Sequence, residues 1–345
     1  MLDELTVSES AVAGVKKKRR IRRIIMSLVS LMLLLAVGTG AAYVAFLNHV
    51  VTTNIKHAAL LPTAGTNPDG TKAGTSTPQR QPAAKDAQNI LVVGSDSRGS
   101  VANGRSDVIV LVHISSDRKK VYLVHFPRDM YVNVPGHGKD KINAAFAYGG
   151  APLLVQTLQE LVYVPIDHMA VIGFDGFQAM TDALGGLDVY AEEASTEPGS
   201  GTVHVGVNHL GGKAALAFVR ERLQPSEGDI SRGRRQQAFI KALLLQSLSR
   251  ETLTNPIRFA QLVSAGTQNL TLDNAFSIGD MRSEALAMRN LRSKDVAFIT
   301  APFTGFGVTP AGASIDIVDD AQMAQLSFAL ENDDMRTYPI GQQTP

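Results

Sequence analysis

The pattern of apolar and polar positions divides the chain of 345 residues into three parts. Residues 24–47 contain no charged side chain, and a helix needs roughly 20 apolar residues to cross a bilayer. The pattern therefore predicts one transmembrane helix over 24–47, with residues 1–23 as a short tail before it. A cleaved signal peptide is the alternative, but the apolar core of such a peptide is normally about 7 to 15 residues long.

A stretch poor in large apolar residues follows the predicted helix. Residues 62–88 are rich in Pro, Thr, Gly, Ala and Gln and contain no large aliphatic or aromatic side chain. Such a stretch buries too little apolar surface to offset the entropy that is lost when it becomes ordered. We therefore expect residues 48–88 to form a flexible linker, residues 89–334 to form one folded domain and residues 335–345 to form a loose tail.

Within the expected domain, short β-branched runs alternate with runs of helical periodicity. Two of the β-branched runs flank the turn sequence SSDRKK, which predicts an antiparallel hairpin. The mixture of strands and helices along one chain predicts a layered α/β or α+β domain. Expected strands are 89–94, 107–114, 121–126, 169–174, 187–190 and 296–300, and expected helices are 152–162, 175–184, 212–222 and 231–250.

Charge is distributed unevenly, although the formal net charge is only +1. Residues 16–23 (KKKRRIRR) carry seven of the 33 basic side chains, and the first fifteen residues carry three of the 32 acids. This leaves 26 basic and 29 acidic residues from residue 24 onward. The positive-inside rule places the basic tail in the cytoplasm and the folded domain outside the membrane. Nucleic-acid binding by the cluster is the weaker alternative, because basic residues next to a membrane helix meet anionic lipid head groups.

Missing residue types and motifs exclude several classes of protein. The chain has no cysteine, which excludes disulfides, thiolate zinc sites and cysteine nucleophiles. The motifs G-x-S-x-G, H-E-x-x-H and G-x-G-x-x-G are absent, and residues 206–214 lack the glycine spacing of a P-loop. His113 and His125 lie on the expected hairpin, where histidines are more often strand residues than metal ligands.

Acids and arginines occur where the first two expected strands end or begin. Asp96 and Arg98 lie in GSDSRG, directly after the first strand, where ligand groups commonly lie in such folds. Arg105 and Asp107 lie in the sequence RSD, which opens the next strand. Two carboxylates at adjacent strand ends can share one Mg²⁺, a cation that prefers oxygen ligands. The alternative is that Asp96 and Asp107 are turn and cap residues.

Two more groups of polar residues are candidates for an anion site. In residues 126–143 (FPRDMYVNVPGHGKDKIN), Arg128 follows a strand, and Lys141 and Asn143 precede a helix. Residues 219–237 contain five arginines around a turn between two expected helices, and helical spacing turns Arg234 away from the others. The side chains of this segment that can converge on one ligand are those of Arg220, Arg222, Arg232, Arg235 and Gln236, with Asp229 at the start of the second helix.

The prevalence of arginine in this second group favours a diphosphate ligand. The planar guanidinium group donates two parallel hydrogen bonds to phosphate oxygens and always keeps its charge. A helix N-terminus supplies further donors for an anion. A solvated charged face is the alternative, but a local arginine cluster is hard to explain as general solubilisation in a slightly acidic domain.

These motifs, in this order, closely resemble the LytR-CpsA-Psr family of cell-wall glycopolymer ligases. The resemblance covers about residues 89–250 and rests on GSDSR, RSD, PRDMYVNVPGHGKDKINAAFAYGG, HLGGKAALAFVRER and GDISRGRRQQ. It implies a fold with a central mixed sheet flanked by helices. It also implies a membrane-anchored phosphotransferase, which moves an anionic glycopolymer with its linking phosphate from a polyprenyl-pyrophosphate carrier to a peptidoglycan hydroxyl.

The resemblance further implies roles for individual residues. Asp96 and Asp107 would hold Mg²⁺ or Mn²⁺, and either Asp229 or Asp96 would accept or position the acceptor proton. The catalytic group would comprise Asp96, Arg98, Asp107, Arg128, Arg220, Asp229 and Arg232. Residues around the pyrophosphate would be Arg98, Arg105, Arg128, Lys141, Asn143, Arg220, Arg222, Arg232, Arg235 and Gln236.

Family members enclose the prenyl chain in an apolar pocket, although ordinary core packing explains the same apolar residues here. Two other functions remain open, a polyprenyl-pyrophosphate hydrolase and a non-enzymatic lipid sensor or transcriptional attenuator. We expect no DNA-reading helix in the basic tail, which argues against direct recognition of a promoter. Candidate pocket residues are Leu154, Leu158, Val162, Ile172 and Phe174.

Overall fold

The computed structural model describes residue 32 and residues 37–62, 77–95, 106–197, 201–221, 229–247 and 249–339. It divides into two compact units, residues 1–50 and 51–345. Residues 37–54 are helical, and half of the predicted transmembrane span lies outside the described residues. Among the residues that are described, no helix is both long enough and apolar enough to cross a membrane.

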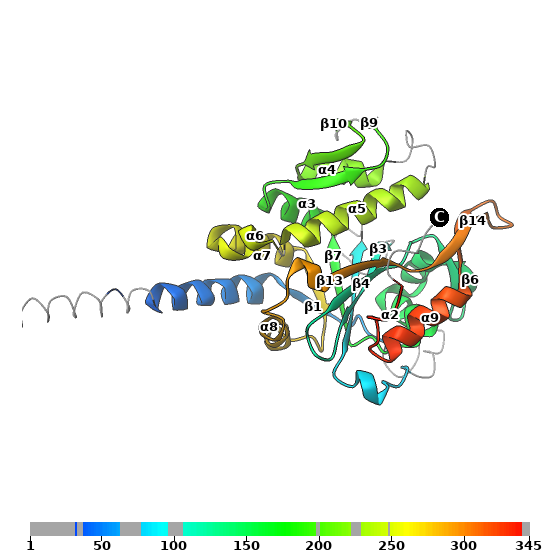
Figure 1. The fold of residues 1–345 in the computed structure, drawn as a ribbon, viewed down its shortest axis with the longest axis horizontal. Coiled ribbons are helices and arrows are strands. Elements are labelled where there is room, and N and C mark those ends of the chain that lie inside the picture. Colours follow the sequence, from blue (N-terminus) through cyan, green and yellow to red (C-terminus); the bar gives the residue numbers. More distant parts are fainter. Residues whose placement is uncertain are drawn as a thin grey trace, which may run out of the picture. The chain divides into compact units, whose positions relative to one another are not determined.

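A seven-stranded mixed sheet forms the centre of the second unit, which confirms the α/β prediction (Figure 1). The expected hairpin is also confirmed, because β3 and β4 pair antiparallel with Val110 opposite His125. The strand order is β1 (Lys56–Ala58), β12 (Leu270–Asp273), β7 (His168–Gly173), β2 (Gln88–Ser95), β3 (Ser106–Ile114), β4 (Val121–His125) and β13 (Val296–Thr300).

The strand directions bring several loops to one edge of this sheet. Strand β2 is parallel to β7 and antiparallel to β3, and β3 is antiparallel to β4. The carboxyl ends of β2, β4 and β7 therefore lie at the same edge as the beginning of β3. Ligands of open α/β sheets commonly bind beyond such an edge.

Side chains of β3 alternate between two apolar cores, one on each face of the sheet, as the period of a strand requires. Ile109 and Leu111 belong to the core that contains α2 (Ile142–Val162) and α9 (Asp320–Glu331). Val108 and Val110 belong to the core that contains α3 (Phe174–Ala183), α4 (Gly212–Arg220) and α5 (Asp229–Ser247). Figure 1 shows these two groups of helices on opposite sides of the sheet.

Helix α2 is longer than the predicted helix 152–162, because it begins before a kink. Gly149 and Gly150 have non-helical dihedral angles inside α2, and φ of Gly150 is +66°, which glycine adopts without steric cost. Pro152, two residues after Gly150, lies in the first turn of the second, predicted part of the helix, where a missing N–H is tolerated.

The remaining elements complete the unit around these layers. A four-stranded sheet has the order β14 (Phe303–Val308), β15 (Ser314–Val318), β5 (Met130–Val134) and β6 (Gly138–Lys141). Two ribbons pair β8 (Leu187–Ala191) with β11 (Gly206–Leu210) and β9 (Ser195–Glu197) with β10 (Gly201–Val203). The further helices are α6 (Arg250–Thr254), α7 (Pro256–Gln268), α8 (Ile278–Ala287), η1 (Pro82–Ala84) and η2 (Ser293–Asp295).

The described parts of the predicted linker 48–88 are folded. Strand β1 pairs parallel with β12 through its backbone, although Lys56 and His57 are exposed, and Leu60 beyond it is buried in the core. Arg80 donates hydrogen bonds of 2.5 and 2.6 Å to the carboxylate of Asp167 and one of 2.6 Å to the carbonyl of Ala87. The composition of residues 62–88 gives no sign of this ion pair, since Asp167 is distant in sequence.

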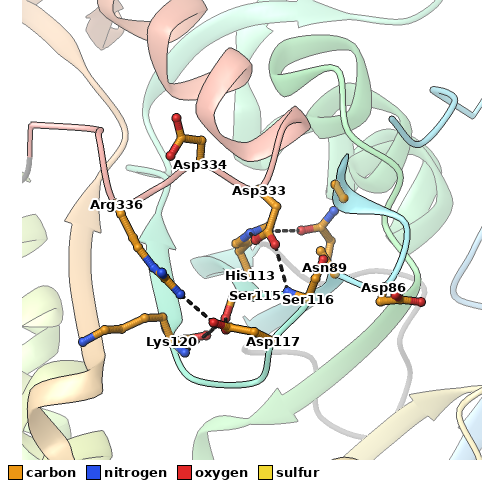
Figure 2. A network of polar contacts seen from close by, with 12 residues as sticks. Asp86, Asn89, His113, Ser115, Ser116, Asp117, Lys120, Asp333, Asp334 and Arg336 are labelled. Carbon is orange, nitrogen blue, oxygen red and sulfur yellow. Dashed lines mark hydrogen bonds and ion pairs between the residues drawn. The ribbon is translucent and has the colours of Figure 1, made fainter. Parts of the chain in front are cut away.

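The predicted loose tail also differs from the structure. Met335 and Tyr338 are buried in the core next to α9, so the folded region extends beyond residue 334. Figure 2 shows the polar contacts of this segment, in which Asp333 accepts from the backbone N–H of Ser116. Arg336 donates a hydrogen bond of 2.7 Å to Asp117. Residues 340–345 lie outside the described part of the chain.

Candidate functional site

A buried carboxylate holds two cationic side chains at the edge of the sheet where β4 ends. Asp129 accepts from Lys141 Nζ at 2.8 Å, and its second oxygen lies 3.3 Å from Arg128 Nε. The side chains of Arg128, Asp129 and Lys141 are 13, 12 and 21% exposed. These partly exposed cations are strong donors for an anion, since the guanidinium of Arg128 has five N–H groups and the ammonium of Lys141 has three.

Local backbone contacts fix this arrangement. Lys141 is the N-cap residue of α2, and the buried Asn143 donates its backbone N–H to the carbonyl of Arg128 at 3.2 Å. The carbonyl of Asp129 accepts from the backbone of Asp316 on β15. The structure thus brings together Arg128, Lys141 and Asn143, three of the predicted pyrophosphate-binding residues.

The acid that joins the two cations was missed by the sequence analysis. Asp129 follows Arg128 directly in the quoted sequence FPRDMYVN, but no role was predicted for it. A carboxylate between an arginine and a lysine that are both expected at an anion site is the signal that could have identified it.

A second cluster lies where α4 meets α5. Arg220 ends α4 and is exposed, whereas the next residue, Glu221, is buried. Arg235 on α5 is only 5% exposed at its side chain and donates to Glu221 at 2.5 Å. The side-chain amide of Gln236 donates to the carbonyl of Val219 at 3.4 Å. Arg235 and Gln236 therefore share a buried face, and their described contacts are with protein groups.

Arg234 faces away from this cluster, as helical spacing predicts. It donates at 2.9 Å to Glu192, and both side chains are about half exposed. Ser231 on the same helix donates to Glu193 at 2.9 Å. Together with Tyr190, Arg235 and Ala238, these residues line a small hollow against the end of β8.

Several predicted site residues lie outside the described part of the structure. The whole of Asp96, Arg98, Arg105 and Arg222 is outside it, as are the side chains of Asp107, Asp229 and Arg232. The backbone nevertheless places residue 107 on β3, at the point where the pairing with β2 shifts between Gly94 and Ser95. Asp229 and Arg232 lie in the first turns of α5.

One described residue beside position 107 is relevant to the predicted metal site. The neighbouring Ser106 is fully buried, and its hydroxyl has no hydrogen-bond partner in the part of the chain that the structure describes. A buried hydroxyl without a described partner, next to an aspartate in the sequence, is a suitable ligand for a cation that prefers oxygen. Among the described residues, no group of three His, Asp or Glu side chains surrounds a common point.

The predicted lipid-pocket residues are not all brought together. Leu154, Leu158 and Val162 have no exposed surface and belong to the core on the α2 face of the sheet. Ile172 packs against the core on the opposite face, and the side chain of Phe174 lies outside the described residues. These five residues therefore do not line a single pocket, because the sheet separates three of them from Ile172.

The two histidines on the hairpin, His113 and His125, are both buried. Both ring nitrogens of His113 have oxygen partners, Asn89 at 2.8 Å and Asp333 at 3.0 Å. Burial lowers the pKa of His125 to about 4, so this ring is neutral at pH 7. His125 therefore brings no positive charge to the segment that leads into Arg128.

Comparison with known proteins connects this geometry to one family of sequences. Residues 62–332 match the model of the LytR_cpsA_psr family. The chain is 36% identical over 261 residues to the Probable cell wall biosynthesis protein LcpB of Corynebacterium glutamicum, a match that covers 71% of this chain. The same match covers 61% of LcpB, so the chain corresponds to less than two thirds of that protein.

Two further matches cover a larger share of the protein to which the chain is similar. The polyisoprenyl-teichoic acid–peptidoglycan teichoic acid transferase TagT of Bacillus subtilis is 28% identical over 331 residues, which cover 92% of this chain and 97% of TagT. A structure of TagT bound to LI-WTA has a TM-score of 0.59 at 27% identity and covers 80% of this chain and 99% of that chain. The mixed sheet and its flanking helices thus recur in a transferase structure.

Proposed function

Since the chain belongs to the LytR-CpsA-Psr family, whose model it matches over residues 62–332, we propose that it is a membrane-anchored phosphotransferase. It moves an anionic glycopolymer with its linking phosphate from a polyprenyl-pyrophosphate carrier to a hydroxyl of peptidoglycan. The similarity to TagT, a polyisoprenyl-teichoic acid–peptidoglycan teichoic acid transferase, supports this substrate class. The observation that carries the proposal is the pair of cations, Arg128 and Lys141, held by one buried carboxylate at the edge of the sheet.

The positive side chains bind the diphosphate and stabilise the charge that develops on it. Arg128 and Lys141 approach from the edge of the sheet, and Arg220 approaches from the end of α4. Arg98, Arg105, Arg222 and Arg232 complete the set by their positions in the sequence. Donors that are already fixed in place stabilise developing charge without reorganising during the reaction.

The chemical step is a displacement at the phosphorus atom that carries the glycopolymer. The acceptor hydroxyl oxygen forms a new P–O bond, and the P–O bond to the lipid phosphate breaks, which releases polyprenyl monophosphate. Asp229 or Asp96 takes the hydroxyl proton as general base or orients that hydroxyl. The arginines hold the two oxygens in line with the phosphorus.

Asp96 and Asp107 would hold the divalent cation, Mg²⁺ or Mn²⁺, and the buried hydroxyl of Ser106 supports a site for a hard cation at that position. When bound, the cation supplies charge neutralisation for the diphosphate oxygens. The pairing of β2 with β3 supports this site, because it holds Ser95 at the end of β2 opposite Ser106 at the start of β3.

The location follows from the substrates and the charge pattern. Peptidoglycan lies outside the cytoplasmic membrane, and the basic residues 16–23 favour a cytoplasmic tail followed by a transmembrane helix over 24–47. The prenyl chain of the donor would contact the face of the sheet that carries Ile172, next to the start of α3 at residue 174. Leu154, Leu158 and Val162 are closely packed on the opposite face and are left out of this contact.

The test uses the full chain in phospholipid vesicles with farnesyl-pyrophosphate-linked N-acetylglucosamine and soluble peptidoglycan fragments. The expected product is a saccharide phosphate joined covalently to the fragment. Arg128→Ala and Arg220→Ala should each lower transfer by about 10- to 100-fold, because each removes a charged hydrogen bond to the diphosphate. Arg234→Ala is the matched control and should transfer at the wild-type rate.

Two results would contradict the proposal. Equal release of saccharide phosphate with and without fragments would identify a hydrolase. Undiminished transfer by both arginine variants would remove these residues from the site.

A further inference from the structure

Glu221 follows Arg220 in the sequence, and its side chain is turned into the protein. Its side chain is completely buried, whereas the side chain of Arg220 is exposed. Glu221 is the first residue after α4 and has extended dihedral angles, φ −64° and ψ 136°. Successive side chains of extended backbone leave the chain in different directions. The inward direction of Glu221 therefore favours the outward direction of Arg220 before it.

Arg235 is the partner that draws Glu221 inward. Its guanidinium donates to Glu221 at 2.5 Å, to the hydroxyl of Ser195 at 3.0 Å and to the carbonyl of Glu193 at 3.3 Å. The same group lies 4.7 Å from the ring centre of Phe218, which is fully buried. With 5% of its side chain exposed, Arg235 directs its described hydrogen bonds to protein groups and leaves little surface for a diphosphate.

A second contact holds the other side of Arg220. Gln236, the neighbour of Arg235 on α5, donates to the carbonyl of Val219 at 3.4 Å. Helix α5 thus contacts the residue before Arg220 and the residue after it. The segment Val219–Glu221 can change direction only if α5 moves as well.

A contribution to stability does not by itself explain the buried ion pair between Glu221 and Arg235. One carboxylate oxygen of Glu221 has no hydrogen-bond partner among the described residues. A buried ion pair with an unsatisfied oxygen is often no more stable than apolar side chains of similar volume. Its hydrogen bonds are directional, however, whereas apolar contacts are not.

We infer that Glu221 and Arg235 form a positioning pair, which holds Arg220 in the direction from which it binds the donor diphosphate. Neither residue touches the ligand. This inference rests on the proposed function, because it needs Arg220 at the diphosphate. It also removes Arg235 from the residues that contact the pyrophosphate.

The test is a cycle of variants of the full chain in detergent micelles, with geranylgeranyl pyrophosphate as the calorimetric binding probe and thermal unfolding measured in parallel. The double variant Glu221→Gln/Arg235→Met removes both charges and keeps side chains of similar volume, so that it folds. We expect about tenfold weaker binding by the double variant and by Arg220→Ala. Arg234→Met, on the same helix, is the control and should bind as the wild type does.

The decisive measurement is the triple variant, Arg220→Ala combined with the double variant. If the pair acts through Arg220, the triple variant binds no more than about twofold more weakly than the double variant. A general loss of structure would instead add a further tenfold. Where the double variant does not fold, Arg235→Lys replaces it, because lysine keeps the charge but loses the forked hydrogen bonds.

Two outcomes separate this inference from the proposed function. Weak binding by Arg220→Ala together with wild-type binding by the folded double variant overturns the positioning pair alone. Wild-type binding by Arg220→Ala overturns the diphosphate assignment itself, and the positioning role is overturned with it. Additive losses in the triple variant also overturn the pair.

Discussion

The Nε2 atom of His113 lies 3.0 Å from the Oδ1 atom of Asp333, 220 residues later in the chain (Figure 2). His113 lies on β3, and its side chain has no exposed surface. Its other ring nitrogen is 2.8 Å from the side-chain oxygen of Asn89 on β2. The imidazole therefore joins two strands of the central sheet to the segment that follows α9.

Replacing Asp333 by alanine should destabilise the domain. The change leaves a buried nitrogen of His113 and the backbone N–H of Ser116 without their acceptor. We expect a loss of about 1 to 3 kcal/mol in the free energy of unfolding, measured by urea denaturation. Asp334→Ala is the matched control, because Asp334 is exposed and its side chain has one described contact, with the hydroxyl of Thr337. Equal stability of the two variants would contradict the role of Asp333.

Burial of His125 should make the stability of the domain depend on pH. Burial lowers the pKa of His125 from 6.5 to about 4, so the folded state disfavours the charged ring. Below pH 6.5 the unfolded state binds more protons than the folded state. The stability that is present above pH 6.5 is therefore lost progressively as the pH falls towards 4.

The variant His125→Gln tests this dependence, because glutamine does not titrate. Between pH 7.5 and 5.0 the wild type should lose about 2 kcal/mol more in its free energy of unfolding than the variant. Urea denaturation at both pH values gives this difference. Parallel losses in the two proteins would show that His125 is not responsible.

Asp129→Asn should weaken transfer, because it removes the charge that orients Arg128 and Lys141. The amide keeps the shape of the carboxylate but attracts the two cations less strongly. We expect kcat/KM for the transfer reaction to fall by about 10- to 100-fold. Asp140→Asn on the same hairpin serves as the control, since Asp140 contacts Tyr148 and the backbone of Lys141. Similar losses in both variants would argue against a specific role for Asp129.

Strands with a clear apolar pattern were the easiest part of the fold to predict from the sequence. The expected strand 296–300 agrees with β13, and the expected strand 121–126 agrees with β4 to one residue. Strands β1 and β12 were missed, because four residues or fewer carry too little periodicity. Such strands are fixed by pairing with distant segments, as β12 is by β7.

The sequence predicted which residues belong to the region of the candidate site better than it predicted their contacts. Helical spacing correctly placed Arg235 and Gln236 on one face of α5. The same spacing could not show that this face is buried, because Glu221 and Ser195, the partners of Arg235, come from other elements. A residue of the right type at the right position can thus support a site without belonging to it.

The two cores on either side of β3 have a consequence for how the domain comes apart. Neighbouring residues of β3, such as Val108 and Ile109, belong to different cores, so the two cores share this strand. Loss of either core exposes the strand that shields the other. The helices of one face therefore cannot melt as a separate calorimetric unit, and neither half of the domain is a viable fragment by itself.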